Sequence, residues 1–393
     1  MIVVAYHAPL EMLPPGISLI KFLMDRGEDV VYIGLFYTEK TKAILSELGI
    51  PHRLHQRWPV VRFREHPFLR LWFSLTRNYR ASPLCRWYQR KFLWRSFKRL
   101  THAADDSSLV VWTINMQVAA LFGDGLLRYE NRHVAWLTEY GEEVGRDWRG
   151  FSSEKFYANS VLIESEINRA RMLQKDKGLK TLPFVLPNKP YGHPRTRNMT
   201  VQDAEAAKIV SSWKNKTVFL YQGSLGEDRK GIVDMIEWIC EGFPNSVMAV
   251  MSPWSPKIDE ISARHKNFSY VPFVRAPHHL EITSHATIGL AVYTADQVAG
   301  ISPLNGLYCA PNKTFEYCGF GIPLLCNNPP GLRDSVGKAG AAICLPELTR
   351  ESVVAGINKL ISDYHEYSGR AKAFFDSIDL VRIIGEILEA TKE

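Results

Sequence analysis

Residues 301–333 read ISPLNGLYCAPNKTFEYCGFGIPLLCNNPPGLR, and this stretch decides the fold. A loop containing proline and glycine leads into a short helix, two glycines end that helix, and an apolar strand follows. A loop that enters a helix at the edge of a parallel sheet is where α/β folds bind phosphates, because unpaired amides and the helix dipole point there. Lys313 and Glu316 lie in this helix, so an ammonium can face a phosphate while a carboxylate accepts hydrogen bonds from a ribose diol.

The pattern Pro-Asn-Lys-x-x-Glu-Tyr-x-x-x-Gly-x-Pro at residues 311–323 resembles the donor-site motif of the family 4 glycosyltransferases, which have the GT-B fold. In that family the second of two glutamates, separated by seven residues, holds the nucleotide ribose. Glu316 matches the second glutamate, and Tyr308 stands where the family has the first. The alternative is that Glu316 is an ordinary exposed helix carboxylate.

Composition is that of a globular protein with two or three domains: 393 residues, 46% hydrophobic and 23% charged. No run of about 20 apolar residues suggests a membrane-spanning helix. The chain begins directly with a strand-like run and lacks the pattern of a secretion signal. The six cysteines form no CxxC pair, so a metal site or a disulfide framework is not indicated and a cytoplasmic location is expected.

Strand and helix signals alternate in both halves of the chain, which predicts parallel sheets covered by helices. A polar stretch at residues 191–216 separates the two halves. Together with the resemblance, this predicts the GT-B fold, with two Rossmann-like α/β domains facing a cleft. We expect an acceptor domain at residues 1–190, a nucleotide-sugar donor domain at 191–376, and a helix at 377–393 that packs back on the first domain.

Two loops are predicted to serve the donor diphosphate. In the loop 223–230, Lys230-Gly231 matches one of the two diphosphate-clamping pairs of the family. The other family pair is Gly-Arg, but this sequence has Gly223-Ser224 at that place. Arg229 is expected to take over the role of the missing arginine. The second loop places Asn305, Gly306 and Leu307 where family members use backbone amides, although an ordinary tight turn explains the same residues. Solvated side chains are the alternative for Arg229 and Lys230.

Three residues are candidates for catalysis. His7 follows the first predicted strand and Glu139 follows the strand at 133–137, so both lie at strand ends where an acceptor hydroxyl can bind. A histidine or glutamate at such a place is often simply solvated. Lys230, with Arg229 and the helix dipoles, would stabilise the leaving diphosphate.

Other patterns that carry chemistry are absent from the sequence, including GxxxxGK[ST], HExxH, GxSxG and Asp-x-Asp. We therefore expect a metal-independent enzyme without a cofactor other than its nucleotide-sugar substrate. The predicted function is transfer of a sugar to a glycan or lipid-linked acceptor in cell-surface polysaccharide or glycolipid synthesis, and the resemblance implies retention of anomeric configuration. The alternatives are a GT-B-like nucleotide-sugar epimerase or hydrolase, and a non-catalytic nucleotide-sugar or nucleic-acid binding protein.

The positive charge of the chain is concentrated in residues 57–100. This segment holds twelve Lys or Arg and a single acidic residue, Glu65, whereas the whole chain has a net charge of +7. Eleven aromatic residues are interspersed with the cations. We expect this segment to bind an anionic membrane surface rather than nucleic acid. The protein would then be peripheral on the inner face of the cell membrane. The alternative is ordinary domain surface with aromatic side chains in the core.

Overall fold

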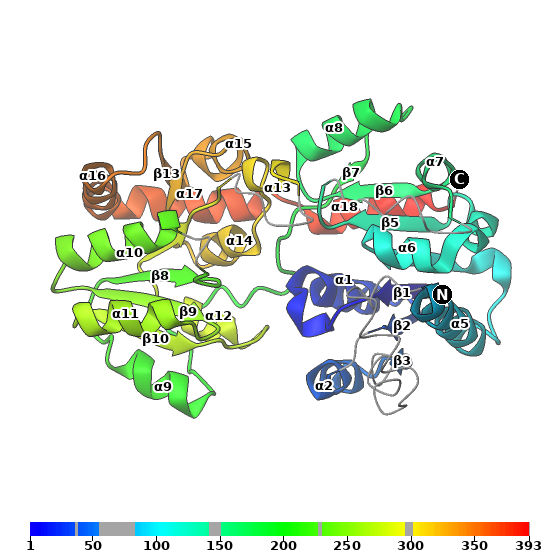
Figure 1. Cartoon of the computed structure of the whole chain (residues 1–393), viewed down its shortest axis with the longest axis horizontal. Helices are drawn as coiled ribbons and strands as arrows, with labels where there is room; N and C mark the ends of the chain where they lie inside the picture. Colours follow the sequence, from blue (N-terminus) through cyan, green and yellow to red (C-terminus); the bar gives the residue numbers. More distant parts are fainter. Residues whose placement is uncertain (36–37, 55–82, 141–150, 227–229, 295–301, 393) are drawn as a thin grey trace. The chain divides into compact units, whose positions relative to one another are not determined.

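The computed structural model describes residues 1–35, 38–54, 83–140, 151–226, 230–294 and 302–392. The chain divides into two compact units (Figure 1). Unit 1 comprises Met1–Leu186 and Val381–Glu393, and unit 2 comprises Pro187–Leu380. Each unit is built around one parallel sheet, as the alternation of strand and helix signals predicts.

The sheet of unit 1 has seven strands in the order β3-β2-β1-β4-β5-β6-β7, and all its pairings are parallel. The strands are β1 (Ile2–Tyr6), β2 (Val30–Gly34), β3 (His52–Leu54), β4 (Val110–Ile114), β5 (His133–Leu137), β6 (Val161–Glu164) and β7 (Phe184–Val185). The helices are α1 (Pro14–Asp25), α2 (Glu39–Glu47), α5 (Pro83–Leu100), α6 (Met116–Phe122), α7 (Ser153–Ala158), α8 (Ile167–Lys177) and α18 (Leu380–Ala390), with short 3-10 helices at Leu10–Met12, Asp106–Ser108 and Gly123–Tyr129.

The central strands of unit 1 are buried on both faces. Every residue of β1, β2 and β5 is buried, as expected for a parallel sheet that helices cover on both sides. The last helix, α18, contributes Ile384, Ile387 and Leu388 to the core at the spacing of one helix face. Helix α6 ends at Phe122, because Gly123 follows with a φ of 69°, so it is shorter than the helix that the sequence predicts at 116–127.

The sheet of unit 2 has six parallel strands in the order β10-β9-β8-β11-β12-β13. The strands are β8 (Val218–Gln222), β9 (Val247–Ser252), β10 (Phe268–Pro272), β11 (Ile288–Ala291), β12 (Leu324–Asn327) and β13 (Ala342–Leu345). The helices are α9 (Ala204–Ser211), α10 (Lys230–Gly242), α11 (Pro256–Arg264), α12 (His279–Thr283), α13 (Leu304–Leu307), α14 (Asn312–Gly319), α15 (Pro330–Leu332), α16 (Arg350–Ser362) and α17 (Tyr364–Asp376), with a π-helical turn at Arg333–Gly337.

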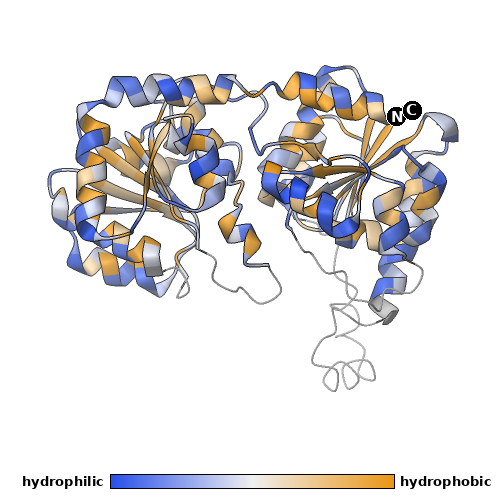
Figure 2. Ribbon diagram, turned by 90° about the horizontal axis from the view of Figure 1, so that it is seen from above, coloured by the Kyte–Doolittle hydropathy of each residue, from blue (hydrophilic) through white to orange (hydrophobic). Residues whose placement is uncertain are grey.

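Alternate residues of β8 enter two separate hydrophobic cores. Val218 and Leu220 pack with residues of α9, α12, α14 and α17, whereas Phe219 and Tyr221 pack with residues of α10, α11 and α16. Because side chains alternate across a strand, the two cores lie on opposite faces of the sheet, and unit 2 has three layers. Figure 2 shows the same pattern, with apolar strands inside and helices whose outer faces are polar.

Helix α14, which carries Lys313 and Glu316, packs unusually close to the sheet. A Cβ atom on Gly289 of β11 would lie 2.4 Å from the ring of Tyr317, so this position accommodates only glycine without a shift of the helix. The Tyr317 hydroxyl donates a hydrogen bond to the carbonyl oxygen of Leu220 in β8, at 2.8 Å. These contacts fix α14 over β8 and β11 and thereby position the two polar residues.

Candidate functional site

Both sheets contain a point at which the strand order reverses direction. In unit 2 this point lies between β8 and β11, and in unit 1 it lies between β1 and β4. Open α/β sheets bind ligands outside the carboxyl ends of the strands at such points. Gln222 ends β8 and Gly223 follows it, whereas His7 follows β1. Of the residues predicted from the sequence, Gly223 and His7 therefore lie where the topology of each unit predicts a ligand.

Lys313 lies in the first turn of α14, and its ammonium group is close to the loop that follows β8. The Nζ atom is 4.4 Å from the ring centroid of Tyr221 and 5.2 Å from that of Tyr293. A Cβ atom on Gly223 would lie 3.2 Å from the same Nζ atom, and the φ of Gly223 is +145°. Two aromatic rings thus hold a cation against a loop whose backbone approaches it closely, which suits an anionic ligand.

Glu316 is buried, with only 5% of its surface exposed. Its Oε1 atom is 3.0 Å from Nε2 of His279, and its Oε2 atom accepts a hydrogen bond of 3.2 Å from Nε2 of Gln222. The structure therefore excludes the alternative of an ordinary exposed helix carboxylate. A carboxylate has about four acceptor positions, so these two contacts leave acceptor capacity on both oxygens.

The remaining predicted donor residues are less informative. Ser224 is exposed in the loop after β8, and Lys230 is the first residue of α10. The Lys230 side chain and the whole of Arg229 lie outside the described residues. Asn305, Gly306 and Leu307 form α13, and their amides donate to the carbonyl oxygens of Ser302 and Pro303 within that turn. In this conformation these three amides are engaged inside the protein.

In unit 1, His7 contacts the residue that follows the neighbouring strand. Its Nδ1 atom is 2.8 Å from the side-chain amide of Asn115, which caps α6 and has a φ of 70°. Burial lowers the pKa of the His7 imidazole to about 4. An imidazole with so low a pKa is a weak proton acceptor at neutral pH, so His7 is better suited to orient a polar ligand than to act as a general base.

Glu139 follows β5, and strand β4 separates it from β1 and His7 in the sheet. The side chain is exposed, yet nearby protein atoms partly desolvate its carboxyl group and raise its pKa, an effect that the positive charge of Arg169 opposes. A raised pKa brings a carboxylate closer to the range of a useful general base. Of the two candidates in unit 1, Glu139 therefore fits proton transfer better.

A buried ion pair lies beside Glu139. Arg169 in the first turn of α8 and Glu164 at the end of β6 are 2.9 Å apart, and their side chains are 3% and 1% exposed. The same Arg169 nitrogen donates to the carbonyl oxygen of Thr138, at 3.1 Å. Burial raises the pKa of Glu164 to about 7, although Arg169 opposes this shift. The pair ties the end of β6 and the start of α8 to the residue that precedes Glu139.

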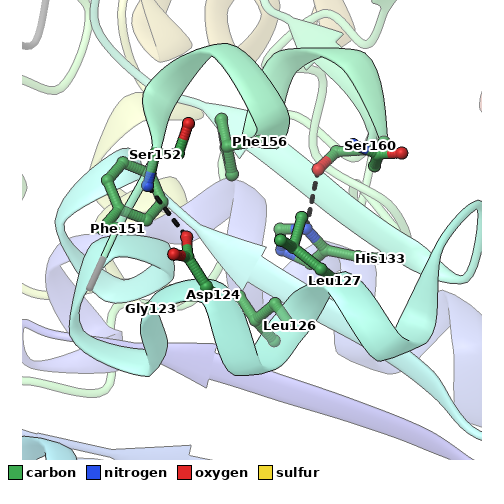
Figure 3. A pocket seen from close by; sticks show the side chains of 10 residues that line it. Gly123, Asp124, Leu126, Leu127, His133, Phe151, Ser152, Phe156 and Ser160 are labelled. Carbon is green, nitrogen blue, oxygen red and sulfur yellow. Dashed lines mark hydrogen bonds between the residues drawn. The ribbon is translucent and has the colours of Figure 1, made fainter.

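A separate pocket of unit 1 lies at the start of β5, the end of the strand opposite to Glu139 (Figure 3). His133 contributes to its lining and contacts the hydroxyls of Thr113 and Ser160, at 2.9 and 2.8 Å. Burial lowers the pKa of His133 to about 3, so this histidine is a neutral core residue. No residue predicted from the sequence as functional lines this pocket.

The described residues show neither a metal centre nor a membrane-spanning helix. They contain no group of three or more His, Cys, Asp or Glu side chains arranged to hold a metal ion. They also contain no helix that is both long enough and apolar enough to cross a membrane.

Sequence reasoning missed three polar residues that touch the candidate donor site: Gln222, His279 and Thr283. Gln222 is a polar side chain at the end of an otherwise apolar strand, which is a recognisable signal for a ligand-facing edge. His279 and Thr283 lie on a short helix that the sequence analysis did not identify, and only the fold brings them to Glu316 and Gln222.

Comparisons with known proteins find similarity in structure alone. No protein-family model and no curated protein sequence matches the chain. Among solved structures, a glycosyltransferase from Rickettsia africae matches with a TM-score of 0.65 and 10% identity, covering 100% of this chain and 97% of that one. Anabaena Alr3699/HepE in complex with UDP-glucose matches with a TM-score of 0.62 and 10% identity, over 99% and 98% of the two chains. The UDP-GlcNAc 2-epimerase from Neisseria meningitidis bound to UDP-GlcNAc matches with a TM-score of 0.56 and 12% identity, over 99% and 100%.

These matches extend over the full length of the chain and include glycosyltransferases. Sheets of seven and six parallel strands flanked by helices are present, as in those proteins. At identities of 10–12% the similarity establishes the architecture only. The chain has the GT-B fold that its sequence predicts.

Proposed function

We propose that this protein is a glycosyltransferase that uses a nucleotide-sugar donor of the UDP class and a glycan or lipid-linked acceptor. The observation that carries the proposal is the pair Lys313 and Glu316, one turn apart on α14 at the point where the sheet of unit 2 reverses its strand order. A fixed cation and a buried carboxylate at this place match the diphosphate and the ribose of such a donor. Solved structures with this fold in complex with UDP-glucose or UDP-GlcNAc support the choice of nucleotide.

In the proposed reaction the charges of unit 2 stabilise the leaving diphosphate. Lys313, Lys230 and the N-terminus of α10 would supply this positive charge without a metal ion. Retention of anomeric configuration is proposed from the resemblance of residues 311–323 to the family 4 motif alone. On unit 1, Glu139 would bind the acceptor hydroxyl or accept its proton, with His7 orienting the same ligand. The pathway would be synthesis of a cell-surface polysaccharide or glycolipid.

An epimerase acting on the same donors is the alternative, because an epimerase bound to UDP-GlcNAc has the same fold. Product analysis with radiolabelled UDP-hexoses, with and without a membrane lipid extract as acceptor, distinguishes the two. We expect label in the glycan or lipid fraction together with free UDP. Label that stays on UDP in an epimeric sugar would establish the alternative, and tight UDP binding without turnover would indicate a binding protein.

The acceptor side of the proposal includes peripheral binding to an anionic membrane through α5. Trp87, Tyr88, Lys91, Arg95 and Lys98 are exposed on this helix. They recur at positions that share one helix face, and the segment contains no acidic residue from Arg86 to Leu100. Arg90 does not belong to this surface, because its guanidinium donates to the carbonyl oxygens of Leu121 and Ala120. Aromatic rings beside cations suit the headgroup layer.

We expect the protein to co-sediment with vesicles rich in phosphatidylserine at low salt and to dissociate near 1 M salt, where screening shortens to about 3 Å. Replacing Lys91, Arg95 and Lys98 by glutamine should weaken binding about 100-fold, since each cation near such a surface contributes about 1 kcal/mol. The matched control replaces three exposed cations of the α8 region, Arg171, Lys175 and Lys180. Equal sedimentation of the two variants would contradict docking through α5.

A further inference from the structure

Four residues around the candidate donor carboxylate form a closed ring of polar contacts. His279 contacts Glu316 at 3.0 Å, and Glu316 accepts a hydrogen bond from Gln222 at 3.2 Å. Gln222 in turn accepts from the hydroxyl of Thr283 at 2.7 Å, and that hydroxyl is 2.8 Å from the carbonyl oxygen of His279. The ring joins β8, α12 and α14, which are far apart in the sequence.

The ring is largely buried in unit 2, and His279 is its most exposed member. Gln222 is 7% exposed and Thr283 is fully buried, and the side chain of His279 is 12% exposed. In surroundings of low polarity each of these contacts is stronger than in water, and contacts in a chain reinforce one another. One donor engages each oxygen of Glu316, so rotation of the carboxylate would break both contacts at once.

One atom of the ring has no hydrogen-bond partner. Nδ1 of His279 is buried and, within the described part of the chain, no donor or acceptor contacts it. Buried polar atoms are normally paired, and leaving one unpaired costs stability. The imidazole therefore makes its polar contact through its other nitrogen, Nε2, which faces Glu316.

We propose that His279, Gln222 and Thr283 are positioning residues that fix the carboxylate of Glu316 so that it discriminates ribose from deoxyribose in the donor nucleotide. The inference rests on the proposed function, in which Glu316 accepts hydrogen bonds from the ribose hydroxyls. A fixed carboxylate cannot turn to find another partner when a hydroxyl is missing, so a deoxy ligand loses a charge-assisted hydrogen bond. A carboxylate released from the ring can reorient and loses this selectivity.

The test is the ratio of dissociation constants for UDP and for its 2′-deoxy and 3′-deoxy analogues, measured by calorimetry on the full chain. The wild type is expected to bind UDP at least about 10-fold more tightly than the weaker deoxy analogue, as the loss of a hydrogen bond to a charged group predicts. His279→Ala should reduce this ratio to about 3-fold or less. His279→Gln keeps an N–H donor near the position of Nε2 and should preserve it.

Two further comparisons separate positioning from damage to the fold. His278 precedes His279, its side chain is 52% exposed and it contacts Glu281, so His278→Ala should keep the wild-type ratio. Thr283→Val should lower the ratio, whereas Thr283→Ser should retain it, and melting temperatures of all variants are measured in parallel. The two pairs of variants, Ala and Gln at position 279 and Val and Ser at position 283, test the positioning role even where one variant folds poorly.

The outcomes separate this inference from the proposed function. Absence of UDP binding to the wild type would contradict the proposed function itself. UDP binding with a wild-type ratio in both His279→Ala and Thr283→Val would leave the proposed function standing and overturn the positioning role. An equal loss of affinity for UDP and its deoxy analogues would also overturn it, because a general defect does not change selectivity.

Discussion

Replacing Arg169 by methionine is expected to lower the free energy of unfolding by about 3–5 kcal/mol at pH 8, the usual cost of removing one partner of a buried ion pair. The variant leaves Glu164 without its cation in a place where both side chains are almost completely buried. It also removes a hydrogen bond to the carbonyl oxygen of Thr138. Urea unfolding followed by circular dichroism measures the change.

The loss should depend on pH, because the pKa of Glu164 in the folded protein is about 7 and its ordinary value is 4.5. A raised pKa contributes stability that is present below pH 4.5 and is lost as the pH rises through 7. At pH 5 Glu164 is largely protonated and the ion pair with Arg169 is already absent. The destabilisation by Arg169→Met should therefore be clearly smaller at pH 5 than at pH 8.

Two variants serve as controls for this prediction. Combining Arg169→Met with Glu164→Gln removes both charges and should recover most of the lost stability, since neutral replacements of buried pairs are tolerated. Arg350→Met breaks the surface ion pair between Arg350 and Glu241, whose side chains are 53% and 42% exposed, respectively. This variant should change the free energy of unfolding by less than about 1 kcal/mol. A loss from Arg169→Met that is the same at pH 5 and pH 8 would show that the charge of Glu164 is not the cause.

The sequence predicts much of the fold because the buried strands are continuous apolar runs. The predicted bounds of β1 and β5 agree with the structure, and those of several other strands differ by one residue. Strand β3 was not predicted, because it consists of only three half-buried residues directly after a proline and so forms no apolar run. The predicted helix at 350–364 corresponds to α16, which ends at Ser362, and a second helix that follows it, α17, was not predicted. The second, with only Ala371 and Phe375 buried, shows little of the apolar periodicity that identifies a helix.

The candidate donor site was predictable only in the part that is local in sequence. Lys313 and Glu316 are three residues apart, so helix geometry alone places them on one face. The partners of Glu316 come from 37 and 94 residues away, and no local pattern indicates that His279 and Gln222 meet it. The contact of two aromatic rings with Lys313 could likewise not be predicted, because nothing in the sequence distinguishes Tyr221 and Tyr293 from ordinary residues near strand ends.

The burial of Glu316 changes how its replacement has to be designed. Glu316→Ala would leave the donor groups of His279 and Gln222 unpaired inside the protein and reduce stability as well as binding. Glu316→Gln keeps the size and one acceptor oxygen, removes the charge, and leaves only one of the two donors without an acceptor. It is the better variant for reading binding, with the melting temperature as a check on the fold.

Calorimetric titration of UDP into the wild type and Glu316→Gln tests the central claim most directly. The account predicts that the wild type binds UDP and that Glu316→Gln binds it about 1–3 kcal/mol more weakly, as expected for losing charge-assisted hydrogen bonds to the ribose, while inorganic pyrophosphate binds both proteins equally. UDP affinity that is the same for the two folded proteins, or no UDP binding to the wild type, would contradict a nucleotide-sugar site at Glu316.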